Sequence, residues 1–131
     1  MLSGEPRQED GRRMAAALLT LDAPPTAIFA ASNLLTLGAL QAIRDCGLEV
    51  PAQVAVVGFD DAPWAGLLAC PLTTVSQPSY DMGRRAAELL FDRLDLPARA
   101  PALVVLAPSL VIRASCGAAL RRGPAQIPSA G

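Results

Sequence analysis

Apolar residues recur at helical spacing in three segments of the chain. Between residues 9 and 21 they follow the i, i+3, i+4, i+7 pattern, which marks one face of a helix. The segment 34–46 is apolar on more than one face, which predicts a helix covered on more than one side. The segment 81–94 has a single apolar side. We therefore expect helices over these three ranges.

Short apolar runs lie between the helices and predict strands at 26–31, from Val54 to 58, and at 73–77, 103–107 and 110–112. The run that begins at Val54 has no polar alternation, which is typical of a parallel strand buried on both faces. From 9 to 58 helix and strand alternate, as in parallel α/β sheets. The pattern predicts an α/β fold: a three-layer parallel sheet with helices on both faces.

Two carboxylates follow the run that begins at Val54. In open α/β sheets, ligands bind outside the carboxyl ends of the strands. Asp60 comes directly after the strand, so we expect it, rather than Asp61, to be a ligand-binding residue. The alternative is that both carboxylates cap the next turn, which Ala62 and Pro63 continue.

Composition indicates that part of the apolar surface meets something else. The chain has 131 residues, enough for one domain or part of one. Hydrophobic residues make up 52% of it and the mean hydropathy is +0.36, which is high for a small domain. No run reaches the roughly 18 apolar residues of a membrane span. The excess apolar surface is expected to meet a partner subunit or an absent part of the domain.

Charge and residue types exclude several functions. The net charge is −1 and all eleven basic residues are scattered arginines, so we expect no DNA-binding face on this chain. Histidine is absent, and three distant cysteines without a C-x-x-C spacing argue against a disulfide framework or a zinc site. We expect no catalytic residues, metal or cofactor. The N-terminus does not resemble a secretion signal, which favours the cytoplasm.

Eight short motifs occur in a fixed order: Pro25-Thr-Ala-Ile-Phe-Ala30, Ser32-Asn33, Leu37-Gly-Ala-Leu40, Gly47-Leu-x-Val-Pro51, Val54-x-Val-x-Gly-Phe-Asp-Asp61, Pro71-Leu-Thr-Thr-Val-x-Gln-Pro78, Met82-Gly83 and Leu110-Val-Ile-Arg113. In this order and spacing they resemble the C-terminal half of the sugar-responsive core of LacI/GalR-type transcriptional repressors. The resemblance runs from about Gly4 to Ser115.

The resemblance implies a periplasmic binding protein-like core of type I, incomplete in this chain, with the effector between two subdomains. Residues 1–77 and 109–114 would form the second, C-terminal subdomain. Residues 78–108 would be a helix and a strand of the first. Residues 115–131 lack periodicity and are expected to be a disordered tail. The helix-turn-helix and hinge of the family are expected to be missing.

The resemblance also implies ligand-binding residues. Asp60 matches the acidic residue that accepts hydrogen bonds from an effector, a sugar or a nucleobase-like molecule. Ser32 and Asn33 occupy the places of a usual Asn-Asp pair, although Ser32 would equally suit a helix cap. Gln77 matches a crossover residue at the pocket floor, or has a hinge role only. Pro6 stands where many members place a stacking aromatic, so no aromatic platform is expected there.

The family dimerises through positions that Leu37, Trp64, Leu67 and Leu68 occupy here. Large apolar residues outside any period suit an interface core. The alternative is a loop that folds back over its own core. Operator DNA would be bound only through a helix-turn-helix absent from this chain.

The expected function is therefore the ligand-sensing and dimerisation part of a LacI-type transcriptional regulator. The alternative is a stand-alone sugar-binding module or a fragment of a solute-binding protein. An enzyme that uses Asp60 and Asp61 for metal or phosphate chemistry is disfavoured, because histidine, a P-loop and a further acidic cluster are lacking.

Overall fold

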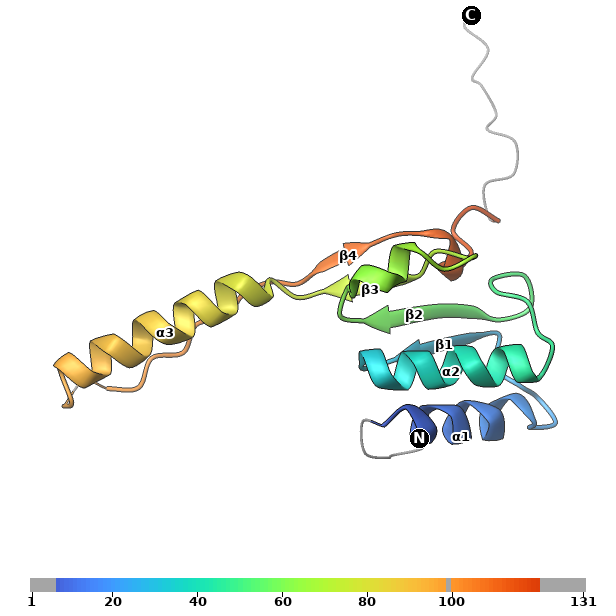
Figure 1. The fold of residues 1–131 in the computed structure, drawn as a ribbon, viewed down its shortest axis with the longest axis horizontal. Coiled ribbons are helices and arrows are strands. Elements are labelled where there is room, and N and C mark those ends of the chain that lie inside the picture. Colours follow the sequence, from blue (N-terminus) through green and yellow to red (C-terminus); the bar gives the residue numbers. More distant parts are fainter. Residues whose placement is uncertain (1–6, 99, 121–131) are drawn as a thin grey trace, which may run out of the picture.

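The computed structural model describes residues 7–98 and 100–120. Its elements follow one another as α1 (Gln8–Leu19), β1 (Ala27–Ala30), α2 (Asn33–Asp45), β2 (Ala55–Phe59), the 3₁₀ turn η1 (Pro63–Gly66), β3 (Thr73–Ser76), α3 (Ser79–Asp95), β4 (Ser109–Val111) and the 3₁₀ turn η2 (Ala114–Cys116). Figure 1 shows a sheet with α1 and α2 beside it, and an arm that extends away from the sheet. We call residues 78–108, which include α3, the arm.

The sheet has the order β1-β2-β3-β4. The first three strands are parallel, with Ile28 paired to Val56 and Gly58 to Thr74. The predicted α/β class with a mostly parallel sheet is confirmed. β4 departs from the parallel expectation and runs antiparallel to β3, with Ser76 paired to Ser109. The reason is geometric: the chain leaves the sheet at Ser76 and returns at the same edge, so its next strand must run back.

The helices α1 and α2 pack tightly because small residues lie between them. A Cβ atom on Gly38 would lie 2.0 Å from the carbonyl oxygen of Gln8, and one on Gly11 would lie 2.5 Å from that of Leu35. Beneath α2, the core is formed by Ile43, Val54, Val56, Ala65 and Leu72, which are all buried. The Ser32 hydroxyl caps the start of α2, and Gly47, with φ 66°, follows its end in the left-handed conformation that glycine allows.

The predicted third layer, with helices on both faces of the sheet, differs from the structure: among residues 7–98 and 100–120 helices cover only one face. Side chains alternate along a strand, so Phe29 points away from the face on which Ile28 packs. Phe29 is 60% exposed, and Leu110 of β4 is 58% exposed. This open apolar surface accounts for part of the high mean hydropathy.

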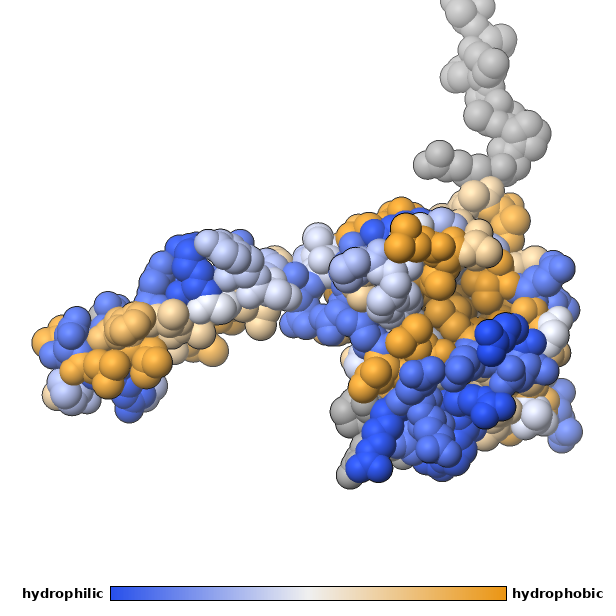
Figure 2. Space-filling model, in the orientation of Figure 1, coloured by the Kyte–Doolittle hydropathy of each residue, from blue (hydrophilic) through white to orange (hydrophobic). Residues whose placement is uncertain are grey.

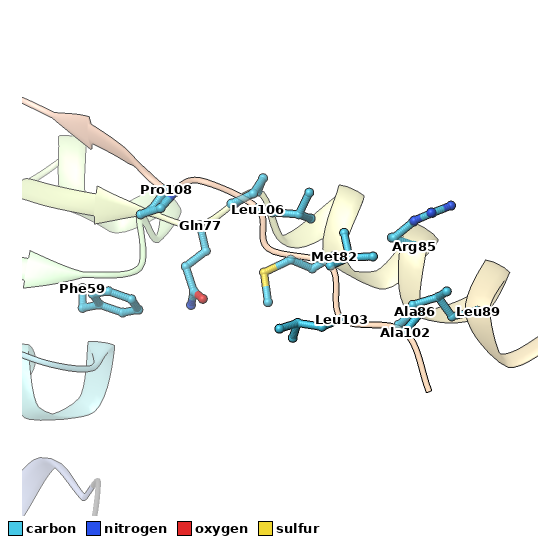
Figure 3. Close-up of a pocket in the computed structure, with 12 residues that line it drawn as sticks. Phe59, Gln77, Met82, Arg85, Ala86, Leu89, Ala102, Leu103, Leu106 and Pro108 are labelled. Atoms are coloured by element: carbon cyan, nitrogen blue, oxygen red, sulfur yellow. The ribbon is translucent and has the colours of Figure 1, made fainter. Parts of the chain in front are cut away.

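The predicted strand at 103–107 is wrong. Residues 101–108 form no regular element and are exposed throughout. They run back along α3, where Leu103 and Leu106 line a hollow with Met82 and Leu89 (Figure 3). A strand needs a neighbouring strand for its backbone hydrogen bonds, and the neighbour here is a helix.

Residues 115 and 116, which were expected to belong to a disordered tail, are part of the folded structure. Ala114–Cys116 form η2, and Ser115 is fully buried. Its hydroxyl donates to the Val56 carbonyl oxygen at 2.6 Å and accepts from the Thr73 N–H at 2.8 Å. These two hydrogen bonds anchor η2 to both β2 and β3. Residues 121–131 lie outside the described residues.

Candidate ligand-binding site

Asp60 ends β2 in a left-handed backbone conformation, with φ 71°. It is the one residue other than glycine with positive φ in the part of the chain that the structure describes. The conformation is unfavourable for a residue with a Cβ atom, although Asp tolerates it better than most. The Asp60 N–H donates to the Val75 carbonyl oxygen at 2.9 Å, which holds the turn against β3.

Gln77 follows β3 and meets Asp60 directly. The Nε2–H of Gln77 donates to Asp60 Oδ1 at 2.6 Å, although 17 residues separate them. Both residues follow parallel strands that neighbour each other, so the carboxyl edge of the sheet brings them together. The sequence suggested each residue separately, and the structure places them in one contact.

The two residues line an open polar hollow of about 430 Å³, together with Asn33, Asp61, Ala62, Pro63, Ser76 and Ser79. No basic or aromatic side chain lines it among the described residues. Asn33 enters it as the first residue of α2. Ser76 and Ser79 were not expected from the sequence, although their places on either side of the Gln77-Pro78 crossover were a usable signal.

Ser32 lies at the same edge but is engaged elsewhere. Its Oγ accepts from the Leu35 N–H at 3.3 Å, and its carbonyl oxygen accepts from the Thr36 hydroxyl at 2.7 Å. Ser32 does not line the polar hollow. The structure thus provides the helix cap that the sequence offered as the alternative to ligand contact, and a ligand role for Ser32 stays a prediction.

Asp61 is bonded to Arg113, which follows β4. Arg113 donates from Nη1 to Asp61 Oδ1 at 2.6 Å and from Nη2 to Oδ2 at 2.9 Å. Thr74 Oγ1 donates to the same Oδ1 at 2.8 Å. The hydrogen bonds from Arg113, assisted by that from Thr74, hold the pKa of Asp61 below its usual value against the opposing effect of burial. Arg113 was not expected at this site, although it ends the motif Leu110-Val-Ile-Arg113.

A second, apolar hollow of about 370 Å³ lies where the arm leaves the sheet. Figure 3 shows the Gln77 side chain between the Phe59 ring and the side chains of Met82 and Leu103. Gln77 therefore lines both hollows. Gln77 is the last residue before the arm, so it lies between the polar hollow at the sheet edge and the apolar hollow beside the arm.

The four expected interface residues have different surroundings. Trp64 and Leu68 are partly buried against the core, and Leu37 of α2 is partly buried as well. Leu67 is 84% exposed. The packing of Trp64 and Leu68 agrees with the alternative of a loop that folds back over its own core, and an interface role for the four residues stays a prediction.

Residues 2–116 match the family of periplasmic binding protein-like domains. The chain belongs to this family. Over 107 residues it is 36% identical to the HTH-type transcriptional repressor PurR of Pasteurella multocida, covering 82% of this chain and 32% of the repressor. The predicted resemblance to LacI-type regulators is thereby confirmed, and the chain corresponds to part of their periplasmic binding protein-like region.

Solved structures agree with this assignment. A complex of the transcriptional regulator CelR with cellobiose matches with a TM-score of 0.77 and 37% identity, covering 88% of this chain and 37% of that one. A LacI-family regulator from Enterococcus faecalis V583 with bound ribose matches with a TM-score of 0.78 and 25% identity, covering 87% and 42%.

The chain spans about a third of the length of the curated relatives it matches. These relatives are transcriptional regulators and not enzymes, so the enzyme hypothesis has no support. None of the described helices is long and apolar enough to cross a membrane.

Proposed function

We propose that this chain supplies one wall of the effector site, and part of the dimer contact, in a LacI-type transcriptional regulator of the cytoplasm. The effector is a sugar or a similar small molecule. Operator DNA is bound through a helix-turn-helix that this chain does not contain. The observation that carries the proposal is the contact of Asp60 with Gln77 at the carboxyl edge of a parallel sheet.

The chemistry of this wall suits an uncharged, hydroxyl-rich ligand. A carboxylate is acceptor-only, and Gln77 occupies just one oxygen of Asp60, so the other oxygen is available to a ligand hydroxyl. Asn33 and Gln77 add amide groups, which both donate and accept. Because Arg113 neutralises Asp61, Asp60 is the main charge on the wall. The negative wall disfavours an anionic group at this position.

The arm supports the proposal that a second lobe completes the site. No residue of α3 is buried, although the helix carries Leu90, Phe91 and Leu94. Figure 2 shows apolar residues along the arm, which has little of the protein against it. We infer that residues 78–108 pack into the first subdomain of the longer regulator, while residues 1–77 and 109–114 form the second.

A single wall binds its ligand weakly. A hydrogen bond to a charged group contributes roughly 1.5–3 kcal/mol, and association costs several kcal/mol in lost ligand freedom. We therefore expect at most millimolar affinity for sugars in this chain alone. The second lobe adds contacts and excludes water.

Calorimetry with ribose and cellobiose tests the proposal. The chain alone, and a fusion that supplies the missing lobe from a related regulator, are titrated with each sugar. Binding by the fusion, lost in Asp60→Ala and kept in the exposed loop variant Asp22→Ala, is the expected result. Micromolar binding by the chain alone contradicts the one-wall argument, and unchanged binding by the Asp60→Ala fusion contradicts the role of Asp60.

A further inference from the structure

The Asp61 carboxylate serves as an anchor. Both of its oxygens accept from the Arg113 guanidinium, at 2.6 and 2.9 Å, and Oδ1 also accepts from the Thr74 hydroxyl. The Asp61 and Arg113 side chains are only 23% and 24% exposed. A two-pronged Arg–carboxylate pair fixes geometry as well as charge. Both oxygens of Asp61 are therefore engaged within the protein, whereas Gln77 engages only one oxygen of Asp60.

Arg113 ties this anchor to the start of β3. Its Nη1 also donates to the Leu72 carbonyl oxygen at 2.8 Å. Its backbone N–H donates to Thr73 Oγ1 at 2.9 Å, and the Thr73 hydroxyl donates back to the Arg113 carbonyl oxygen at 3.1 Å. One residue thus joins the end of β4, the start of β3 and the turn after β2.

Asp60 depends on such support. A left-handed conformation at a residue with a Cβ persists only where the surroundings impose it. On one side the Asp60 N–H is held by the Val75 carbonyl oxygen. On the other side the chain enters Asp61, whose side chain is fixed by Arg113. The backbone that aims the Asp60 side chain thus lies between the Val75 contact and the Asp61 anchor.

Each of the two connections between the sheet and the arm leads to a residue that bonds one of the carboxylates, Asp60 or Asp61. The outgoing connection carries Gln77, which bonds Asp60. The return connection leads through β4 to Arg113, which bonds Asp61. The geometry points to Arg113 as a positioning residue: through Asp61 it holds Asp60 in the orientation that meets Gln77, and so links the return connection of the arm to the ligand carboxylate. The part of this inference that concerns a ligand rests on the proposed function.

The side-chain amide of Gln77 reports the orientation of Asp60 without any ligand. Its NMR signals are assigned in the 131-residue chain by comparison with Gln77→Glu, and Asp60→Ala gives their position when the acceptor is lost. In Arg113→Met we expect these signals to move to the Asp60→Ala position. Asp61→Asn should move them in the same direction, and the double variant should move them no further, because both changes release one contact.

Arg12→Met is the matched control, because Arg12 forms an ion pair with Asp45 at 2.8 Å on the helical layer. It should leave the Gln77 signals unchanged even if it lowers stability. Unchanged Gln77 signals in folded Arg113→Met would overturn the inference. If that variant does not fold, Arg113→Lys decides, since Lys keeps the charge and loses the two-pronged geometry. A partial shift supports positioning by Arg113, and no shift overturns it.

The sugar-binding fusion then tests the link to the ligand. Arg113→Met should lower sugar affinity about tenfold or more, the loss expected when a charge-assisted hydrogen bond is misaligned. Arg12→Met should leave affinity unchanged. Full affinity in a variant whose Gln77 signals have moved would overturn the link. A fusion that binds neither ribose nor cellobiose counts against the proposed function, while the Gln77 signals still decide whether Arg113 positions Asp60.

Discussion

The backbone of Gly38 lies so close to that of Gln8 that a Cβ atom on Gly38 would be 2.0 Å from the Gln8 carbonyl oxygen. The contact is between α2 and the first turn of α1, so neither backbone can yield without separating the helices. The packing of α1 on α2 therefore depends on the absence of a Cβ atom at Gly38, as it does at Gly11.

Gly38→Ala should therefore destabilise the chain. Alanine favours a helix by about 1 kcal/mol over glycine, but overpacking against a rigid backbone costs about 1–3 kcal/mol or more. We expect a net loss in the free energy of unfolding, measured by urea denaturation. Gly83→Ala on α3 is the control, because a Cβ there meets no atom within 4 Å. Similar stability for both variants would contradict the packing argument.

Ser115→Ala should also destabilise the chain, although it lies in a segment expected to be disordered. The substitution leaves the Val56 carbonyl oxygen and the Thr73 N–H without their buried partner. Each buried group left without a partner costs about 1–3 kcal/mol. For the two groups together we expect a loss of about 2–6 kcal/mol in chemical denaturation. The exposed Ser109→Ala should change stability little, and an equally small effect at Ser115 would show that η2 is not anchored as described.

The Asp61–Arg113 pair should make stability depend on pH. The folded-state pKa of Asp61 lies below the ordinary value of 3.8, so the charged form binds Arg113 and stabilises the fold above that value. This contribution is lost as the pH falls from about 3.8 through the lowered pKa. Unfolding measured between pH 6 and pH 2 should show a steeper acid loss for the wild type than for Asp61→Asn. Parallel curves would mean that the pair contributes nothing measurable.

Leu67 provides a test of association. Its side chain is 84% exposed, while the neighbouring Trp64 and Leu68 pack on the core. At tens of micromolar, an order of magnitude typical of weak interfaces, we expect the chain to form a dimer or soluble aggregates. Light scattering should show less association for Leu67→Asp. Leu21→Asp, which changes an exposed leucine in another loop, is the control. A monomeric wild-type chain at this concentration would contradict the interface.

The position of Asp60 could be predicted because a buried strand that ends in a carboxylate has few interpretations. Its contact with Gln77 was not predicted, because the sequence alone does not say that the strands before the two residues are neighbours. The role of Arg113 could not be found in this way. It depends on the antiparallel return of β4, which brings a residue 52 positions away to Asp61.

The segment 103–107 shows an element that was predicted from the sequence but is not formed. Its run of Leu and Val has the pattern of a buried strand, but local pattern does not say whether a partner strand is present. Ser32 illustrates a third limit. A serine at the start of a helix satisfies the rule for a cap and the rule for a ligand residue equally, and only the Leu35 contact shows the cap.

The pairing of Ser76 with Ser109 has a mechanical consequence. The arm is joined to the sheet by two adjacent strands that are hydrogen-bonded to each other, in place of two independent linkers. Such a ribbon can twist and bend, but its strands cannot slide past one another without breaking their ladder. A rotation of the arm therefore moves the end of β3 and the start of β4 together. Gln77 and the chain that leads to Arg113 turn as one unit.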